Sequence, residues 1–146
     1  MAYPSCPETK KKLVEINENC WRCEATGKEY PEPQWRYCMS MKAEDSSGHS
    51  WVTAFDDTAK EILGVDAKHM MELKNAGEAD PAKQAEFAAV FDNVVGTDFV
   101  FRCVLKEDTY QDETRLKTSL LGADKMDYAA ESRHILSTLK AAGISA

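Results

Sequence analysis

Two cysteines separated by two residues, Cys20 and Cys23, are the first feature of this sequence with the spacing of a chemical site. A Cys-x-x-Cys pair is half of a structural zinc site, in which two such pairs hold one tetrahedral Zn²⁺ ion. In thioredoxin-like redox proteins the same pair opens a helix after a strand. Here the pair runs into EATGKEYP (24–31), which is typical of a hairpin. The pair therefore favours a ribbon-like hairpin over a redox site.

The remaining cysteines and the histidines do not complete an obvious metal site. The chain has five cysteines, an odd number, and its N-terminus lacks the basic-then-apolar pattern of a signal peptide, which disfavours a disulfide framework. Cys38 and Cys103 lie within apolar runs and are predicted to be core residues. The histidines are predicted to be solvated or locally hydrogen-bonded, and they are His49, His69 and His134.

The sequence offers little support for catalysis or for a membrane span. It has no Gly-rich phosphate loop, no nucleophile beside a plausible base, and no two histidines at metal-binding spacing. No apolar run approaches the roughly 18 residues that a membrane span needs. We therefore expect a protein that is not an enzyme, has no membrane partner, and works in the cytosol or the nucleus.

These residues must be positioned by a small domain, because 43% hydrophobic residues in a chain of 146 suffice for one core. Residues 1–34, which we call the ribbon segment, show little apolar periodicity and predict a loop-and-hairpin element that needs a staple such as a metal. Aromatic and β-branched runs predict strands, and capping residues before helical spacing predict helices. The predicted strands are 34–45, 50–57, 97–108 and 114–124, and the predicted helices are 56–64, 66–77, 80–94 and 126–143.

Strands interrupted by helices predict an α+β fold, mainly β, of the OB type. In this interpretation the ribbon segment precedes a small antiparallel barrel at 35–124, with a helical connector at 56–93 between its strands. The last helix, 126–143, is amphipathic, and its apolar face carries Ile135, Leu136 and Leu139. That face must fold back onto the domain or pack against a partner.

Three stretches of the sequence resemble a known family in their order and spacing. They are WRCE…YPEPQWRY (21–37), WVTAFDDTAKEILG (51–64) and KEDTYQDETRLK (106–117). They resemble the C-terminal single-strand-binding domain in the large subunit of replication protein A, and the resemblance covers nearly all of residues 3–142. It implies an OB-fold barrel with an inserted zinc ribbon, binding of single-stranded DNA in replication, repair and recombination in the nucleus, and a terminal helix that joins two smaller subunits in a heterotrimer.

The start of the barrel departs from the family pattern. Family members carry a strand just before the ribbon, whereas this chain begins with Met1 at the ribbon. We therefore expect either a five-stranded OB barrel that lacks its first strand or a truncated chain. A missing first strand would leave an unpaired sheet edge facing solvent.

The resemblance also indicates which residues occupy the zinc-ligand positions of the family's ribbon. It aligns Cys6 and Cys23 with the first position of each ligand pair of the family's zinc ribbon, and Thr9 and Thr26 with the second positions. Threonine is a poor zinc ligand. Cys20 lies outside this register, so Cys20-x-x-Cys23 is not itself a family ligand pair.

Two alternatives remain for the ribbon segment. A local shift would recruit Cys20 beside Cys6 and Cys23, giving three thiolates with a water or a carboxylate as the fourth zinc ligand. The candidate carboxylates are Glu24 and Glu29. Otherwise the ribbon segment has lost its metal and is held by packing of the aromatic residues Trp21, Tyr30 and Trp35.

The resemblance places candidate DNA contacts on two strands and a loop. Trp51 and Phe55 on the second strand and Tyr110 on a connecting loop match aromatic residues of the family's DNA-contacting surface. Aromatic faces stack bases, and basic groups follow the phosphates. Arg115 and Lys117 alternate on the next strand, so both lie on one face, where they could meet phosphates. Further basic candidates are Arg36 and Lys42.

Each candidate contact also has a purely structural interpretation. Trp51 and Phe55 share a face that could equally be the core face, and Arg115 and Lys117 could simply be solvated. The net charge of −7 argues against a general polyanion binder. Acidic residues near the candidate contacts should also weaken phosphate binding by the domain alone. These residues are Asp56, Asp57, Glu107, Asp108, Asp112 and Glu113.

The sequence therefore supports more than one functional hypothesis. The first is a single-strand-binding module of a replication protein A-like complex. The second is chiefly an assembly module that holds a heterotrimer through its terminal helix and has little DNA affinity of its own. A specialised telomeric paralogue is a further alternative. If Trp51, Phe55 and Tyr110 were all buried, the assembly role would be favoured.

Overall fold

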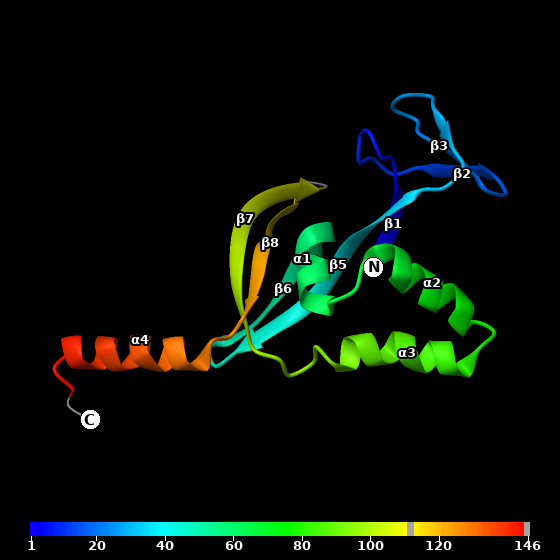
Figure 1. The fold of residues 1–146 in the computed structure, drawn as a ribbon. Coiled ribbons are helices and arrows are strands. Elements are labelled where there is room, and N and C mark those ends of the chain that lie inside the picture. Colours follow the sequence, from blue (N-terminus) through cyan, green and yellow to red (C-terminus); the bar gives the residue numbers. More distant parts are fainter. Residues whose placement is uncertain (111–112, 145–146) are drawn as a thin grey trace.

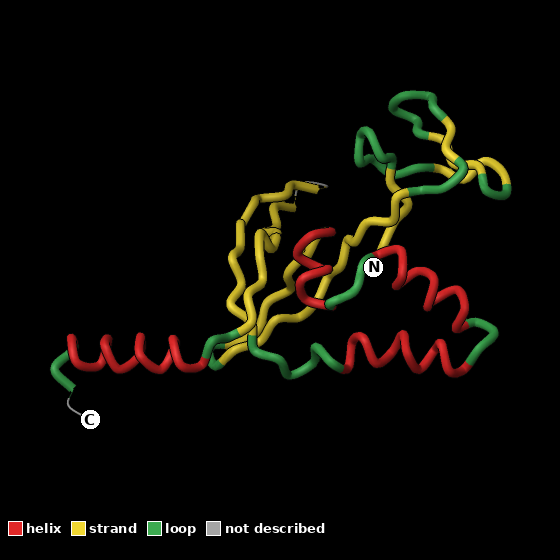
Figure 2. Tube along the Cα trace, viewed as in Figure 1, coloured by secondary structure: helices red, strands yellow, loops and turns green. Residues whose placement is uncertain are grey.

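The structure, a computed structural model, describes residues 1–110 and 113–144, without the side chains of residues 109, 110 and 113. Figure 1 and Figure 2 show one long curved sheet with helices beside it, a small sheet projecting near the N-terminus and the last helix projecting at the other end. The strands are β1 (Ala2–Ser5), β2 (Val14–Asn17), β3 (Cys20–Arg22), β4 (Glu29–Tyr30), β5 (Gln34–Asp45), β6 (Gly48–Phe55), β7 (Phe99–Tyr110) and β8 (Glu113–Lys125). The helices are α1 (Asp56–Leu63), α2 (Ala67–Gly77), α3 (Pro81–Asp92) and α4 (Tyr128–Ala141).

The main sheet has five strands in the order β1-β5-β6-β8-β7. Its pairs are antiparallel except for β6 and β8, which run parallel. β1 pairs with β5 from Ala2 opposite Tyr37 to Ser5 opposite Gln34, so a short first strand is present. Because β1 and β7 are the two edges, the sheet is open and not closed into the predicted barrel. This five-stranded, partly open arrangement with interposed helices is OB-fold-like.

The core lies between the sheet and the helices α1 and α2. Side chains alternate between the two faces of a strand, so Val52 and Ala54 point to the same side of β6. α1 packs across β5, β6 and β8 on that side, and Figure 1 shows it inside the curve of the sheet. The buried residues of this core include Tyr37, Met39, Val52, Ala54, Ala59, Ile62, Leu63, Ala67, Met70, Leu120 and Ala123.

The helices α1, α2 and α3 lie between β6 and β7, and they start and end near their capping residues. The side chain of Asp66 accepts a hydrogen bond from the His69 backbone amide at 2.9 Å, and Asp80 accepts one from the Ala82 amide at 2.9 Å. α1 ends at Gly64, which adopts the left-handed conformation at φ 73° that closes a helix. α2 and α3 contact each other as a pair beside the sheet (Figure 1).

The ribbon segment forms a separate three-stranded sheet in the order β2-β3-β4 after β1. Figure 1 shows it projecting at the start of β5. Its small core contains buried Cys6, Leu13 and Cys23, against which Trp21 and Tyr30 pack. Trp21 meets Trp35 of β5 edge to face, with ring centroids 6.1 Å apart.

α4 runs away from the sheet (Figure 1). Its start is fixed by Asp127, whose side chain accepts hydrogen bonds from the amides of Ala129 and Ala130, both at 3.0 Å. The Tyr128 hydroxyl donates to Asp98 at 2.9 Å. No described residue of α4 is buried, so the helix does not fold back onto the domain. Within the described ranges, none of the helices has the length and apolar character to cross a membrane.

Two sequence predictions for the strands are wrong. Cys38 and Cys103 were predicted to be core residues, but both are exposed. Cys38 lies opposite Phe55 on the side of the sheet away from α1, because its neighbours Tyr37 and Met39 take the core side. Cys103 lies where the ladder between β7 and β8 shifts its register. An apolar run alone does not show which of its residues face inward.

Replacing Tyr37 with phenylalanine tests a hydrogen bond at the centre of the core. Tyr37 is 1% exposed, and its hydroxyl donates to the Val65 carbonyl at 3.2 Å. The Tyr37→Phe variant should lose about 1 kcal/mol of unfolding free energy at neutral pH, measured by urea denaturation. Tyr3→Phe is the control, because the Tyr3 hydroxyl bonds the Lys10 carbonyl at the surface, and it should change stability by less than about 0.5 kcal/mol.

The parent chain and Tyr37→Phe should also differ in how their unfolding free energy changes in alkaline solution. Burial, together with the nearby Asp66 and Asp56 carboxylates, raises the pKa of Tyr37 to about 12 from an ordinary 10.0. The folded chain therefore keeps a proton that the unfolded chain loses. This contribution to stability is complete below pH 10 and is lost as the pH rises towards 12. An equal alkaline loss in the parent and in Tyr37→Phe would contradict this assignment.

Candidate nucleic-acid interface

The side of the main sheet turned away from α1, here called the outer face, gathers most of the candidate contacts. Strand register determines which residues share it: Lys42 lies opposite Trp51, and Cys38 lies opposite Phe55. On the neighbouring hairpin, Lys106 lies opposite Lys117 and Asp108 lies opposite Arg115. Cross-strand partners point to the same side of a sheet, so these pairs extend one surface over β5, β6, β8 and β7.

The aromatic candidates on β6 are exposed. Trp51 is 67% exposed and Phe55 is 46% exposed, whereas Val52 and Ala54 between them are 4% and 0% exposed. Because α1 covers the Val52 side, the alternation of the strand turns Trp51 and Phe55 to solvent. Large exposed aromatic side chains on a sheet face are suited to stack on flat apolar groups such as nucleobases.

A groove of about 340 Å³ lies beside Trp51, between β6 and β8. These strands pair over only two residues each, Val52 with Thr118 and Thr53 with Ser119. The groove lies at this short ladder and is lined by Trp51, Thr53, Asp108, Arg115, Leu116, Lys117 and Thr118. It therefore combines one aromatic face with two cationic groups from the neighbouring strand.

Two lysines of the outer face lie next to each other, whereas its other cations lie beside carboxylates. Lys106 and Lys117 lie directly opposite each other, and like charges at such positions destabilise a sheet. An anion bound between them would relieve that repulsion. Lys42, beside Trp51, holds the Glu44 carboxylate at 3.0 Å in a surface ion pair.

Acidic groups limit how freely the cations act. Arg36 lies 3.5 Å from Asp56, which also accepts a hydrogen bond from the Tyr37 amide at 3.0 Å. Arg36 is therefore held beside a carboxylate at the end of the outer face. Asp108 lines the groove opposite Arg115. An approaching phosphate must compete with these carboxylates for the basic side chains.

The structure places two residues differently from what the sequence predicted. Tyr110 was placed in a connecting loop, but its backbone is the last residue of β7, and its side chain lies outside the described part of the structure. Lys106 was not among the candidates. Its position on the outer face depends on the register between β7 and β8, which the sequence does not reveal.

The cysteines of the ribbon segment fall into two environments. Cys6 and Cys23 are both buried, and the Thr9 hydroxyl lies 3.5 Å from the Cys23 sulfur. The Cys6 thiol and the Tyr30 hydroxyl share a hydrogen bond of 3.6 Å. Burial raises the pKa of Cys6, but hydrogen bonds from Thr9 and Tyr30 outweigh it and lower the pKa to about 6. Hydrogen bonds from the Thr26 and Thr9 hydroxyls lower the pKa of Cys23.

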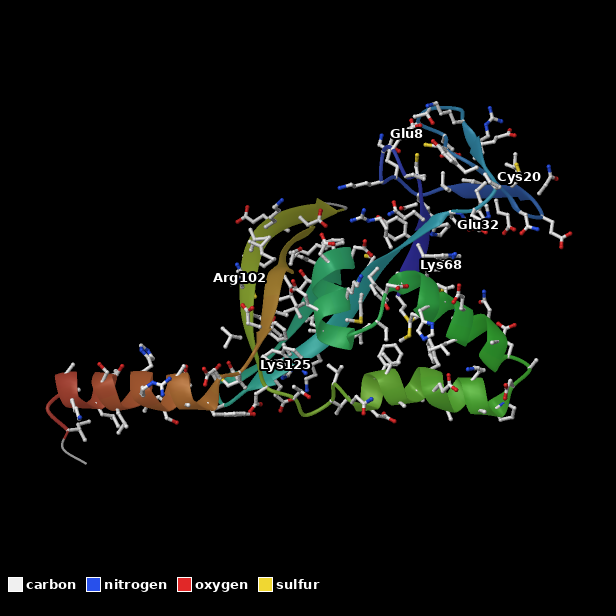
Figure 3. The ribbon with its side chains drawn as sticks, viewed as in Figure 1. Glu8, Cys20, Glu32, Lys68, Arg102 and Lys125 are labelled. Atoms are coloured by element: carbon white, nitrogen blue, oxygen red, sulfur yellow. The ribbon has the colours of Figure 1, made fainter. Side chains whose placement is uncertain are left out.

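Cys20 does not join this cluster. Its sulfur lies 3.7 Å from a Glu29 oxygen, and burial together with that carboxylate raises the pKa of Cys20. Figure 3 shows Cys20 at the edge of the ribbon segment away from Glu8, which lies in the turn after Cys6. The local shift that would bring Cys20 beside Cys6 and Cys23 is therefore absent from the structure.

The donor set does not fit structural zinc. Such a site takes four strong ligands from Cys, His or carboxylate side chains. The cluster offers two thiols, Cys6 and Cys23, and two hydroxyls, Thr9 and Thr26. Among the residues that the structure describes, no three His, Cys, Asp or Glu side chains are placed to hold a metal ion together.

The apolar residues of α4 form an uncovered stripe. Ile135, Leu136 and Leu139 are all exposed, and helical spacing places them on one side of α4. Since α4 projects from the sheet, this stripe is available to other helices (Figure 1).

Comparisons with known proteins connect these features. A family model described as "Replication factor-A C terminal domain" matches residues 1–135. Replication factor A protein 1 of Saccharomyces cerevisiae is 34% identical over 143 residues, which are 97% of this chain and 22% of the relative. The replication protein A 70 kDa DNA-binding subunit of Danio rerio is 32% identical, over 94% of this chain and 22% of the relative. The chain thus spans about a fifth of the length of these relatives.

Two solved structures share the fold. One is a replication protein A heterotrimer bound to ssDNA, with a TM-score of 0.83 and 27% identity over 96% of this chain and 31% of that chain. The other is yeast RPA bound to ssDNA, with a TM-score of 0.82 and 34% identity over 97% of this chain and 77% of that chain. The similarity extends over the ribbon segment, the sheet and most of α4.

Proposed function

This chain belongs to the replication factor-A C-terminal domain family, and on that basis we propose that it binds single-stranded DNA as one module of a replication protein A-like complex. The names of its relatives support this proposal, because one is a DNA-binding subunit and two solved structures hold ssDNA. Such a complex would serve DNA replication, repair and recombination in the nucleus. The proposed role consists of binding and needs no catalysis.

The exposed pair of Trp51 and Phe55 carries this proposal. An exposed indole ring is stabilised when a base stacks on it, and stacking contributes about 1–3 kcal/mol per base. Lys117 and Arg115 line the groove beside Trp51, where they can meet the phosphates of the same strand. Recognition by stacking and charge tolerates any base sequence, as general single-strand binding requires.

The acidic neighbours predict that this module binds weakly by itself. Arg36, Lys42 and Arg115 each have a carboxylate nearby or opposite, so binding a phosphate must replace an existing interaction. A weak module gains affinity when it is tethered to others, because the linkage raises its effective concentration at the strand. We therefore propose that its contribution to affinity depends on further modules of the same complex.

The exposed stripe on α4 supports a second function, assembly of a heterotrimer. Ile135, Leu136 and Leu139 present an apolar face that the domain itself leaves uncovered. Amphipathic helices bury such faces in bundles with other helices. We propose that α4 packs against helices of two smaller replication protein A-like subunits. This role and DNA binding use different surfaces and are compatible.

Replacing the exposed aromatic residues should weaken binding of oligothymidine. Trp51→Ala and Phe55→Ala each remove a stacking platform, so each should raise Kd by about 5- to 150-fold. Fluorescence anisotropy with a labelled strand measures the change. Leu105→Ala is the control, because Leu105 is exposed on the other side of β7, so the substitution should leave Kd unchanged. Parent-like affinity in both aromatic variants would refute the proposed role of this surface.

Removing a lysine of the outer face should change the salt dependence of binding more than its sequence dependence. A phosphate contact contributes about 0.7 to the slope of log K against log salt for single strands. Lys117→Ala and Lys106→Ala should each reduce the slope by about that amount, and Lys74→Ala on α2 should not. If Lys117→Ala and Lys106→Ala kept the slope of the parent, as Lys74→Ala should, the phosphates would lie elsewhere.

Charged substitutions in the apolar stripe should block assembly. Leu136→Asp with Leu139→Asp places two charges in a helix interface, so co-expressed small subunits should no longer co-elute with the chain. Size-exclusion chromatography with light scattering gives the mass of the complex. Ser137→Asp is the matched control, since Ser137 lies on the opposite side of α4, and the complex should keep its mass. Co-elution of the doubly substituted chain would exclude this interface.

A further inference from the structure

We propose that the ribbon segment folds without a metal ion, around a cluster of two cysteines and two threonines that takes the place of a four-ligand site. The cluster consists of Cys6, Thr9, Cys23 and Thr26. This inference concerns the stability of the ribbon segment and is independent of the proposed DNA-binding surface.

The two turns that carry the cluster have the same backbone geometry. In the first, the Lys10 amide donates to the Cys6 carbonyl at 2.9 Å, and the Cys6 amide donates to the Lys11 carbonyl at 2.8 Å. In the second, the Gly27 amide donates to the Cys23 carbonyl at 2.7 Å, and the Cys23 amide donates to the Lys28 carbonyl at 2.9 Å. The two turns therefore share one pattern of backbone hydrogen bonds.

The fifth residue of each turn has the left-handed conformation that the turn requires. Lys10 has φ 58° and Gly27 has φ 71°. Glycine adopts this conformation without steric cost, whereas a residue with a Cβ such as Lys10 adopts it only when its surroundings favour it. The match between the turns indicates that the chain keeps the shape of a paired-ligand site although half of the ligand positions are threonine.

The chemistry of the cluster argues against zinc. A neutral hydroxyl is a poor ligand compared with a thiolate, and two thiolates alone leave two positions of a tetrahedral ion open. Two of the nearby carboxylates have other partners. Glu8 accepts hydrogen bonds from the Lys28 ammonium at 2.7 and 3.0 Å, and Glu29 faces Cys20.

Other interactions supply what the metal would have supplied. The Thr9 hydroxyl contacts the Cys23 sulfur across the two turns, and Tyr30 bonds the Cys6 sulfur. The ion pair between Glu8 and Lys28 links the same turns at the surface. Beneath them, buried Leu13 and the half-buried Trp21 form the apolar floor. Burying polar sulfur and hydroxyl groups is tolerable because they satisfy one another.

Metal analysis of the full chain tests the proposal. Protein purified without added zinc should contain far less than about one zinc per chain, which is the content of a structural site. The Cys6 and Cys23 amides are bonded within the two turns, so their hydrogen exchange reports on the ribbon segment alone. Their protection should not change when EDTA is added. A content of about one zinc per chain, with protection lost in EDTA, would overturn the proposal.

A doubly substituted chain provides the matched positive control. Thr9→Cys with Thr26→Cys completes a four-thiolate set, so this variant should take up about one zinc per chain and become sensitive to EDTA. Uptake would indicate that the turns keep the geometry of a paired-ligand site. A variant that takes up no zinc would overturn that part of the proposal.

Removal of one hydroxyl tests the hydrogen bonds directly. Thr9→Val keeps the shape of the side chain but removes the contact with the Cys23 sulfur, so the Cys23 amide should exchange several-fold faster. Thr97→Val is the control, because the Thr97 hydroxyl bonds the Asn93 carbonyl near the end of α3 and should leave the ribbon amides unchanged. Parent-like exchange in Thr9→Val would show that this hydrogen bond does not hold the cluster.

Discussion

The packing of α1 against one side of the main sheet determines which side chains of that sheet remain exposed. α1 follows β6 without a connecting loop and buries Ile62 and Leu63 against Val52 and Ala54. Since side chains alternate along a strand, covering Val52 exposes Trp51 on the opposite side. The apolar core and the aromatic outer face are thus two results of one packing arrangement. A change that disturbed the core would also disturb the orientation of the binding surface.

Charge on the outer face is balanced locally and not in excess. Lys106 and Lys117 repel each other across the ladder, while Arg36 and Lys42 are held by carboxylates. The result is a surface with a few cationic side chains within an acidic protein. For the proposed single-strand-binding role, this balance predicts weak binding by the module alone and stronger binding through linkage with other modules.

The sequence predicted the elements well where their signals are local, and less well where they depend on distant contacts. Asp66 and Asp80 mark helix starts because a cap acts within its own turn. The face of Trp51 stayed undecided because both Trp51 with Phe55 and Val52 with Ala54 are apolar sets, and only the position of α1 separates them. Lys106 was overlooked and Cys38 misplaced for the same reason, since strand register is a non-local property. Whether the sheet closes into a barrel is also a non-local property, because it depends on whether β1 and β7 pair with each other.

The short ladder between β6 and β8 has a mechanical consequence. β1, β5 and β6 form one half of the sheet, β8 and β7 form the other, and between these halves only two residue pairs join β6 to β8. The groove beside Trp51 lies at this joint, and α1 braces it from behind by contacting β5, β6 and β8. A ligand that changed the separation of β6 and β8 would therefore rotate one half-sheet against the other. Such a change would couple binding at the groove to the relative orientation of the two halves.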